Sequence, residues 1–344
     1  MPLPLLPIIA IGGACLAGGL GLGEAHVGKV KMDQAQIRID KAKSKYEHKK
    51  ANFDREQKAA TNVLDELGKT RTEIQSSFSR FADAFERIKN RPEQREVGKE
   101  HFKFTSIDLR DIRQASVSAL DIIGSLVAAA GAGGTVAAGV WATVALLGTA
   151  STGAAIAGLH GVAATNALLA CLGGGALAAG GWGMAGGMAV LGGLVAGPAV
   201  LAGGLFANLF VGDKLLEQAD KAEREVDSAV GKMDKSIVFS KNISNLAAAL
   251  LYELRKANFL YETKVSQLEE LVARCDDYNF FSEEDKILLD NNIMLVKVLM
   301  EMTRADLLRK DEEGKPIMKA EAIREREVLA LIDDSERSLN EIAA

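Results

Sequence analysis

The sequence predicts an all-α protein in which long antiparallel coiled-coil helices flank a Gly/Ala-rich apolar helical hairpin, with further helices towards the C-terminal end. Two observations carry this prediction. An apolar residue recurs every three or four positions through both flanks, and residues 122–212 contain no Asp, Glu, Lys or Arg. The recurrence is typical of a helix that packs along one stripe. No segment alternates polar and apolar residues over the length of a strand with turn signals at its ends.

Residues 1–23 form an apolar N-terminal arm or anchor without an acidic or basic side chain. The cationic start of a secretory signal is absent from them. Basic residues follow, so by the positive-inside rule a segment anchored here would leave its C-terminal side in the cytoplasm. The alternative is an arm that packs on the protein's own surface. The basic residues are Lys29, Lys31, Arg38, Lys41, Lys43, Lys45, Lys49 and Lys50.

Residues 24–92 are expected to form the first long coiled-coil helix. The residue before a proline avoids the helical region, so Asn90-Arg91-Pro92 should end it. Residues 93–121 form a junction, in which Ser106-Ile107-Asp108 could cap the helix that enters the apolar block. The apolar seam consists of Met32, Ala35, Ile39, Ala42, Tyr46, Phe53, Ala60, Leu64, Leu67, Ile74, Phe78, Phe81, Phe85 and Ile88.

Residues 122–212 are predicted to be a membrane hairpin. A hydrocarbon core takes about 20 apolar residues per helical crossing, so the run is long enough for more than one. Glycine-rich breaks favour one crossing at about 122–147 and another at about 184–211. Trp141 and Trp182 would then lie at the far interface. Two crossings return the chain to its starting side, where the flanking helices could pack on each other.

Small residues recur every four positions inside this hairpin, a spacing that permits close approach of helices in lipid. The helices could belong to one hairpin or to different protomers, and the alternative is a Gly/Ala-rich core buried in a soluble fold. His160 is either a pH sensor or polar pore-lining group, or a turn residue at the headgroup level. The two rows are Gly175, Ala179, Gly183 and Gly187, and Ala185, Ala189, Gly193 and Gly197.

Residues 213–275 should form the second long helix, with weak points at Gly231 and at 240–244. Residues 276–344 should form a C-terminal helical segment, with one helix from Ser282 to about Lys310 and another from about Met318 to Ile342. The stripe of the second long helix consists of Leu216, Ala219, Val226, Val230, Met233, Ile237, Leu246, Leu250, Leu254, Ala257, Leu268 and Leu271.

The chain lacks the signatures of common catalytic, metal and cofactor sites. Its three cysteines are far apart, and none forms a CxxC. Residues 181–186 match GxGxxG, but no strand pattern precedes them and no acidic residue follows at the distance of a ribose ligand. A net charge of −5 without a basic, aromatic patch argues against nucleic-acid binding. We therefore expect no enzyme activity, no cofactor and no metal.

Over residues 32–275, the order of long helix, Gly/Ala-rich apolar hairpin and long helix resembles the α-helical pore-forming toxins of the cytolysin A and haemolysin BL kind, and type III secretion translocators. The resemblance lies in architecture, without a residue-level motif, and the N-terminal arm and the C-terminal helices depart from it. It implies a sequestered hairpin that inserts when the protein meets a membrane. Residues 161–200 also resemble uncharacterised bacterial glycine-zipper proteins.

The sequence thus predicts a non-enzymatic bacterial protein whose hairpin enters a bilayer and oligomerises to perturb or permeabilise it, under the control of the flanking helices. Its expected partners are a lipid bilayer, further copies of itself and a coiled-coil protein. Its expected location is the inner membrane facing the cytoplasm, or solution before insertion. The alternative is a structural or adaptor protein, with the apolar block as permanent anchor or buried core.

Overall fold

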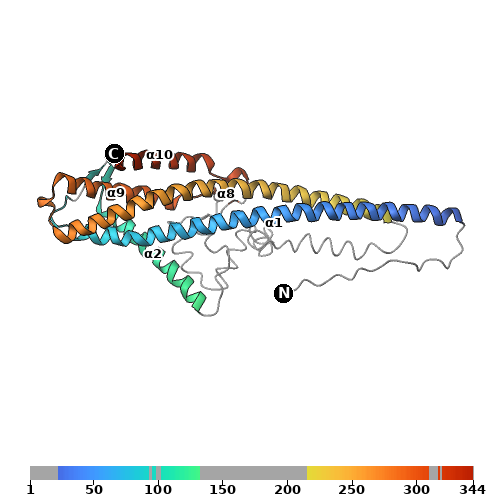
Figure 1. Ribbon diagram of the computed structural model, residues 1–344, viewed down its shortest axis with the longest axis horizontal. Helices are drawn as coiled ribbons and strands as arrows, with labels where there is room; N and C mark the ends of the chain where they lie inside the picture. Colours follow the sequence, from blue (N-terminus) through green and yellow to red (C-terminus); the bar gives the residue numbers. More distant parts are fainter. Residues whose placement is uncertain are drawn as a thin grey trace. The chain divides into compact units, whose positions relative to one another are not determined.

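The computed structural model describes residues 22–92, 95–97, 102–131, 215–309, 317 and 320–343. Helices make up nearly all of this part, which confirms the all-α class (Figure 1). The chain divides into two compact units, one from 1–48 and 200–229, the other from 49–199 and 230–344. The described α-helices are α1 (Leu22–Arg87), α2 (Ser106–Gly131), α8 (Leu215–Arg274), α9 (Glu283–Arg304) and α10 (Glu325–Ala343).

The predicted apolar seam is the buried side of α1. In the first unit it faces a second seam on α8, and both are rich in alanine. In the second unit larger side chains join the alanines, and Leu67, Phe78 and Phe81 are fully buried. The buried seam residues of the first unit are Ala35, Ile39, Ala42 and Tyr46 on α1, and Ala219, Ala222 and Val226 on α8.

The predicted antiparallel arrangement of the two long helices is wrong, because α1 and α8 run in the same direction. In each unit, charged residues further along α1 pair with residues further along α8. An apolar seam reads alike in both directions, so it cannot give the orientation. The charged pairs beside the seam do give it, and the long connection of residues 88–214 permits it. The pairs are Arg38–Asp220 and Lys45–Asp227 in the first unit, and Lys49–Asp234, Glu66–Arg255 and Lys89–Asp276 in the second.

The second unit is a helical bundle in which α9 returns along α8. Arg274 pairs with Asp285 at one level, and the Asn292 side chain donates to the carbonyl of Lys264 further along, so α9 is antiparallel to α8. An antiparallel bridge between Leu308 and Ile323 then turns the chain into α10. Figure 1 shows α10 packed alongside α9.

A small β-hairpin interrupts the helices in the junction after α1, where no strand was expected. Strands β1 (Arg95–Val97) and β2 (Phe102–Phe104) pair antiparallel. Three residues per strand are too few for a visible alternating pattern. The buried Phe104 ring meets Phe81 and Phe85 edge-on, which attaches the hairpin to the α1 core.

Helix α1 ends at Arg87, five residues before Pro92 and earlier than the predicted bound at residue 92. Asn90 has a positive φ of 55°, a conformation that asparagine tolerates better than most residues. The Arg91 guanidinium donates to the carbonyls of Phe85, Glu86 and Ile88, which satisfies acceptors that the helix end leaves open.

Helix α8 continues through both of its predicted weak points. Gly231 is exposed, and a Cβ there would meet nothing within 4 Å, so no packing demands glycine. Ser282 and Asp285 form a capping box at the start of α9. Helix α9 ends at Arg304, earlier than expected. A 3₁₀ turn (Ala320–Ala322) and α10 lie where one helix from about Met318 was expected.

Candidate functional site

The residues predicted to act in the membrane lie outside the described part of the chain. They are Trp141, His160, Gly175, Ala179, Gly183, Gly187, Ala185, Ala189, Gly193, Gly197 and Trp182. Of the two predicted crossings, only 122–131 is described, as the end of α2. Among the helices that the structure describes, none is long and apolar enough to cross a membrane. The candidate site is therefore built from the two helices that border the charge-free run, α2 and α8.

The start of α2 is fixed by a capping arrangement one residue earlier than expected. The Asp108 carboxylate accepts from the Thr105 backbone N–H at 2.8 Å and from the Thr105 hydroxyl at 2.7 Å. An acidic side chain that reaches back to the capping residue satisfies a donor at the helix start, and its charge opposes the helix dipole. Asp108 therefore holds Thr105, the residue directly before the helix, through both its backbone N–H and its hydroxyl.

Two polar contacts fix α2 on α1. Arg113 donates to Asp83 and to Glu86, both at 2.7 Å, and the Ser116 hydroxyl donates to the Ser76 carbonyl at 3.0 Å. The hydrogen bond to Asp83 raises the pKa of the Arg113 guanidinium above its ordinary value, against the effect of burial. Residues further along α2 contact residues earlier in α1, so the two helices are antiparallel.

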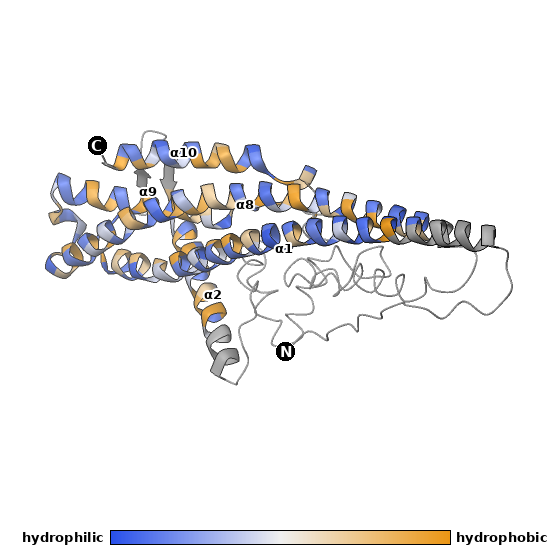
Figure 2. Cartoon of the chain, turned by 45° about the vertical axis from the view of Figure 1, so that its right-hand side comes forward, coloured by the Kyte–Doolittle hydropathy of each residue, from blue (hydrophilic) through white to orange (hydrophobic). Residues whose placement is uncertain are grey.

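The packing stripe of α2 extends into the charge-free run. Buried residues recur at three- and four-residue steps, and the last described one, Ile122, is the first residue of the run. Val117 and Leu120 lie on the opposite side, each about half exposed. Helix α2 continues to Gly131 without a break, and its coloured part carries both polar and apolar residues (Figure 2). The buried residues are Leu109, Ile112, Ala115, Ser116, Ala119 and Ile122.

The first described turns of α8, which follow the run, pair with α1 through surface charges. Asp220 accepts from Arg38 at 2.5 Å, and Asp227 accepts from Lys45 at 2.7 Å. The spacing of these charges in the sequence could have indicated the direction of the two helices. Arg38 and Lys45 are seven residues apart, as are Asp220 and Asp227, so each pair falls on one side of its helix.

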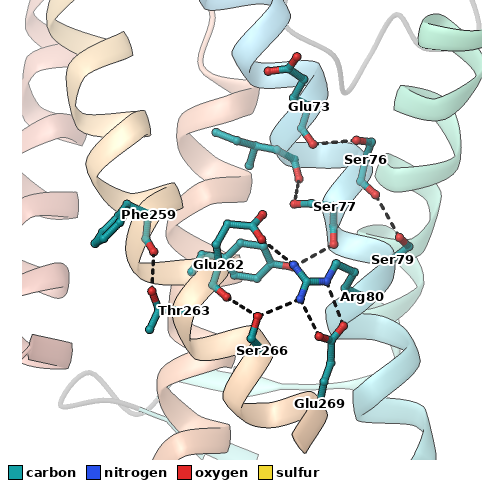
Figure 3. Close-up of polar contacts among 12 residues, drawn as sticks. Glu73, Ser76, Ser77, Ser79, Arg80, Phe259, Glu262, Thr263, Ser266 and Glu269 are labelled. Carbon is teal, nitrogen blue, oxygen red and sulfur yellow. Dashed lines mark hydrogen bonds and ion pairs between the residues drawn. The ribbon is translucent and has the colours of Figure 1, made fainter.

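A charged contact with several hydrogen bonds in the second unit is centred on Arg80 of α1. Its guanidinium donates to both oxygens of Glu269 at 3.0 and 2.6 Å, to Glu262 at 2.5 Å and to the Ser266 hydroxyl at 3.1 Å (Figure 3). The hydrogen bond to Glu269 raises the pKa of Arg80 far above its ordinary value. Arg80 thereby holds two turns of α8 against α1.

Beside this contact, the buried Tyr261 hydroxyl donates to the Ser77 carbonyl at 3.1 Å (Figure 3). Burial raises the pKa of Tyr261 well above its ordinary value, so the phenol stays protonated and remains a donor. The Tyr261 ring also meets Phe78 edge-on at 5.9 Å. The residue therefore ties α8 to the backbone and to the core of α1.

A polar layer crosses the core where α1 meets the end of α9. The fully buried Arg71 donates to the carbonyl of Ala305 at 2.8 Å, and the Gln75 side chain donates to the Thr303 hydroxyl at 3.0 Å. Burial lowers the pKa of Arg71 to about 10, although Asp306 acts in the opposite direction. Ala305 follows the last residue of α9, so the cation lies where the helix dipole is negative.

Most of these charged groups hold helices together. Arg80, Arg113, Asp220 and Asp227 each donate to or accept from a residue of a neighbouring helix. Within the described residues, no group of three His, Cys, Asp or Glu side chains could hold a metal ion. Comparison of the chain with protein-family models, curated proteins and solved structures finds no match. The described part thus consists mainly of helices that pack on each other on both sides of the charge-free run.

Proposed function

We propose that this protein is a membrane-inserting protein whose residues 122–212 enter a bilayer, while the helical scaffold stays in water. The observation that carries the proposal is the absence of Asp, Glu, Lys and Arg throughout this run. A soluble helix normally keeps a polar face towards water. The hydrocarbon core of a bilayer, about 30 Å thick, accepts such a run as helices of about 20 residues each.

The scaffold supports an even number of crossings. Helix α2, which leads into the run, is held to α1 through Arg113 and Ser116. The later part of α8, which follows the run, is held to the same helix through Glu262 and Glu269. Contacts of both helices with α1 support a placement of the two flanks of the run on one side of a membrane. Two crossings satisfy this condition, and the small-residue rows would pack them against each other or against another copy.

Liposome binding and dye release test the proposal. Purified protein should float with vesicles of phosphatidylcholine and phosphatidylglycerol and release an enclosed dye. Leu194→Arg places a charge inside the second predicted crossing, which costs about 3 kcal/mol in a membrane. It should lower insertion and dye release at least tenfold. Tyr252→Arg adds the same charge at an exposed position of α8 and should change neither.

The outcomes separate the proposed activities. Binding without dye release would replace permeabilisation by permanent anchoring. A protein that neither floats with vesicles nor releases dye between pH 5 and 8 would contradict membrane insertion itself. Cross-linking of the vesicle-bound protein would show whether several copies assemble. The same cross-linking without vesicles is the control.

A further inference from the structure

We propose that two copies of this chain pair in water through the outer face of α8, with the two α8 helices antiparallel. The outer face consists of the exposed residues of α8 from Lys241 to Glu270, all of which belong to the second unit. The inference uses only described helices, so it does not depend on membrane insertion. It assigns a surface and a partner to the chain: a second copy of itself.

The centre of the outer face carries two large aromatic side chains that the chain leaves in water. Tyr252 is 69% exposed and Phe259 is 78% exposed, the highest value among the exposed large apolar residues that the structure describes. Figure 3 shows the Phe259 ring pointing away from Arg80. The two residues are seven apart, so they lie about 10 Å from each other on one side of the helix. A single exposed ring is common on a protein surface, whereas two in one row form a patch that fits a partner.

Small side chains border the two rings. Ala248 lies about one turn before Tyr252, and Thr263 lies about one turn after Phe259, and both are exposed. Neither side chain is large enough to hold a second helix away from the rings. The outer face can therefore pack closely along a helix of a partner.

The two cations beside the rings are paired within the chain. Arg255 pairs with Glu66 of α1, and Lys256 pairs with Glu336 of α10 at 3.2 Å. Because carboxylates of neighbouring helices balance these charges, they add little repulsion when two copies of the outer face meet.

The order of residues along the outer face makes it complementary to itself. The exposed Lys241 lies eleven residues before Tyr252, and the exposed Glu270 lies eleven residues after Phe259, about three turns in each case. In an antiparallel pair centred between the two rings, Tyr252 of each copy meets Phe259 of the other. The same pairing places Lys241 of each copy against Glu270 of the other, as a two-fold contact requires.

The charges at the ends of the outer face also select the direction. In a parallel pair Lys241 would face Lys241 and Glu270 would face Glu270, which is repulsive. Within its own chain Lys241 makes only a long contact of 4.0 Å to Glu56, with about half of its side chain exposed. It can therefore reach a carboxylate of the partner.

The size of the contact predicts a weak pair. An aromatic side chain buries at most about 150–250 Å², so the four rings of a dimer contribute up to about 600–1,000 Å². Specific interfaces begin at about 1,000 Å² in total. We therefore expect a dissociation constant on the order of 10 µM.

Sedimentation velocity of the full chain, from about 1 to 100 µM, tests the pairing. Tyr252→Ser and Phe259→Ser should each raise the dissociation constant at least tenfold. Phe280→Ser removes a ring that is 77% exposed outside the outer face, and it should leave association unchanged. If neither α8 variant weakens association, or if the unaltered chain stays monomeric, the inference is wrong.

Charge exchange tests the ends of the outer face. Lys241→Glu places like charges opposite each other and should raise the dissociation constant at least threefold. Glu270→Lys in the same chain should restore the original value. A double variant that associates as weakly as Lys241→Glu alone contradicts the antiparallel arrangement.

Cross-linking tests the direction directly. In a chain whose three cysteines are changed to serine, Ala248→Cys and Thr263→Cys are made as separate proteins. A short bis-maleimide should join them when they are mixed, with at least fivefold less dimer from either protein alone. Self-cross-linking of Ala248→Cys at equal yield would mean a parallel pair, and no cross-linking in the mixture would mean that a second copy does not cover this face. Either result overturns the inference and leaves the proposed function intact, since Tyr252→Ser should not change vesicle binding.

Discussion

The two units hold α1 and α8 together by different means. In the first, small seam residues such as Ala42 and Ala222 bury little apolar surface, and exposed ion pairs lie beside them. In the second, Phe78 and Leu250 fill a core shared by further helices, and Arg71 is buried within it. Surface ion pairs contribute little free energy, whereas large buried side chains contribute much. The first unit thus relies on small residues and exposed charges, whereas the second relies on a large buried core.

The largest expected effect comes from removing a large side chain from the second unit. Phe78→Ala deletes a fully buried ring together with its contact to Tyr261, and it should lower the free energy of unfolding by about 3–5 kcal/mol. Urea unfolding followed by circular dichroism measures this loss. Ile39→Ala is the corresponding variant in the first unit, because it also removes a buried apolar side chain. It should abolish amide protection only in the helical turns around it.

The comparison would break if Ile39→Ala unfolded the second unit as well. Hydrogen exchange resolves the two outcomes, because the amides around Leu250 and Leu254 report on the second core. Equal loss of protection in both regions would mean that stability is shared evenly between them.

A smaller effect should follow from the buried arginine. Arg71→Ala removes the donor to the Ala305 carbonyl and leaves a cavity, which should cost about 3 kcal/mol. Arg71→Met refills the space without a charge to bury, and it should recover most of the loss. Near-ultraviolet circular dichroism with urea unfolding compares the two variants. Equal destabilisation would mean that the hydrogen bond, and not the filled volume, stabilises this layer.

The sequence was sufficient for the helices and their buried sides, because the apolar period of α1 reports directly which face packs. It was insufficient for direction, since a seam containing Ala35 and Ile39 reads alike either way. The seven-residue spacing of Asp220 and Asp227 contained that information. It becomes readable only when Arg38 and Lys45 are known to be the partners. The β-hairpin was not visible in the sequence, because it depends on a distant contact between Phe104 and Phe81.

The polar contacts of the second unit could not be predicted from the sequence. Arg71 appears in the sequence as an interruption of the α1 seam, and only the end of α9 explains it. Arg80 carries no motif at all, because its two carboxylates come from one face of a distant helix. The residues predicted to act in the membrane remain predictions, since they lie outside the described chain.

The capping box of α9 offers a pH test within the second unit. Hydrogen bonds from Ser282 lower the pKa of the Asp285 carboxyl in the folded state. As the pH falls, the unfolded chain therefore takes up this proton first, and the stabilisation by the carboxylate disappears. Asp285→Asn should cost about 1 kcal/mol at pH 7 and progressively less below about pH 4. Glu284→Gln, an exposed neighbour, is the control for charge alone.

The smallest expected effect concerns the ion pairs of the first unit, and it tests the comparison most directly. Asp220→Asn and Asp227→Asn each remove one pair whose side chains are about half exposed, so each should cost about 0.5 kcal/mol. Hydrogen exchange should show faster opening of α1 around Ala42, with the second unit unchanged. Glu47→Gln, which removes an ion pair within α1 alone, is the control. Because salt screens exposed charges, 1 M NaCl should reproduce the loss in the unaltered chain and add nothing to the double variant. If salt weakened the second unit equally, exposed ion pairs would contribute as much to its stability as to that of the first unit.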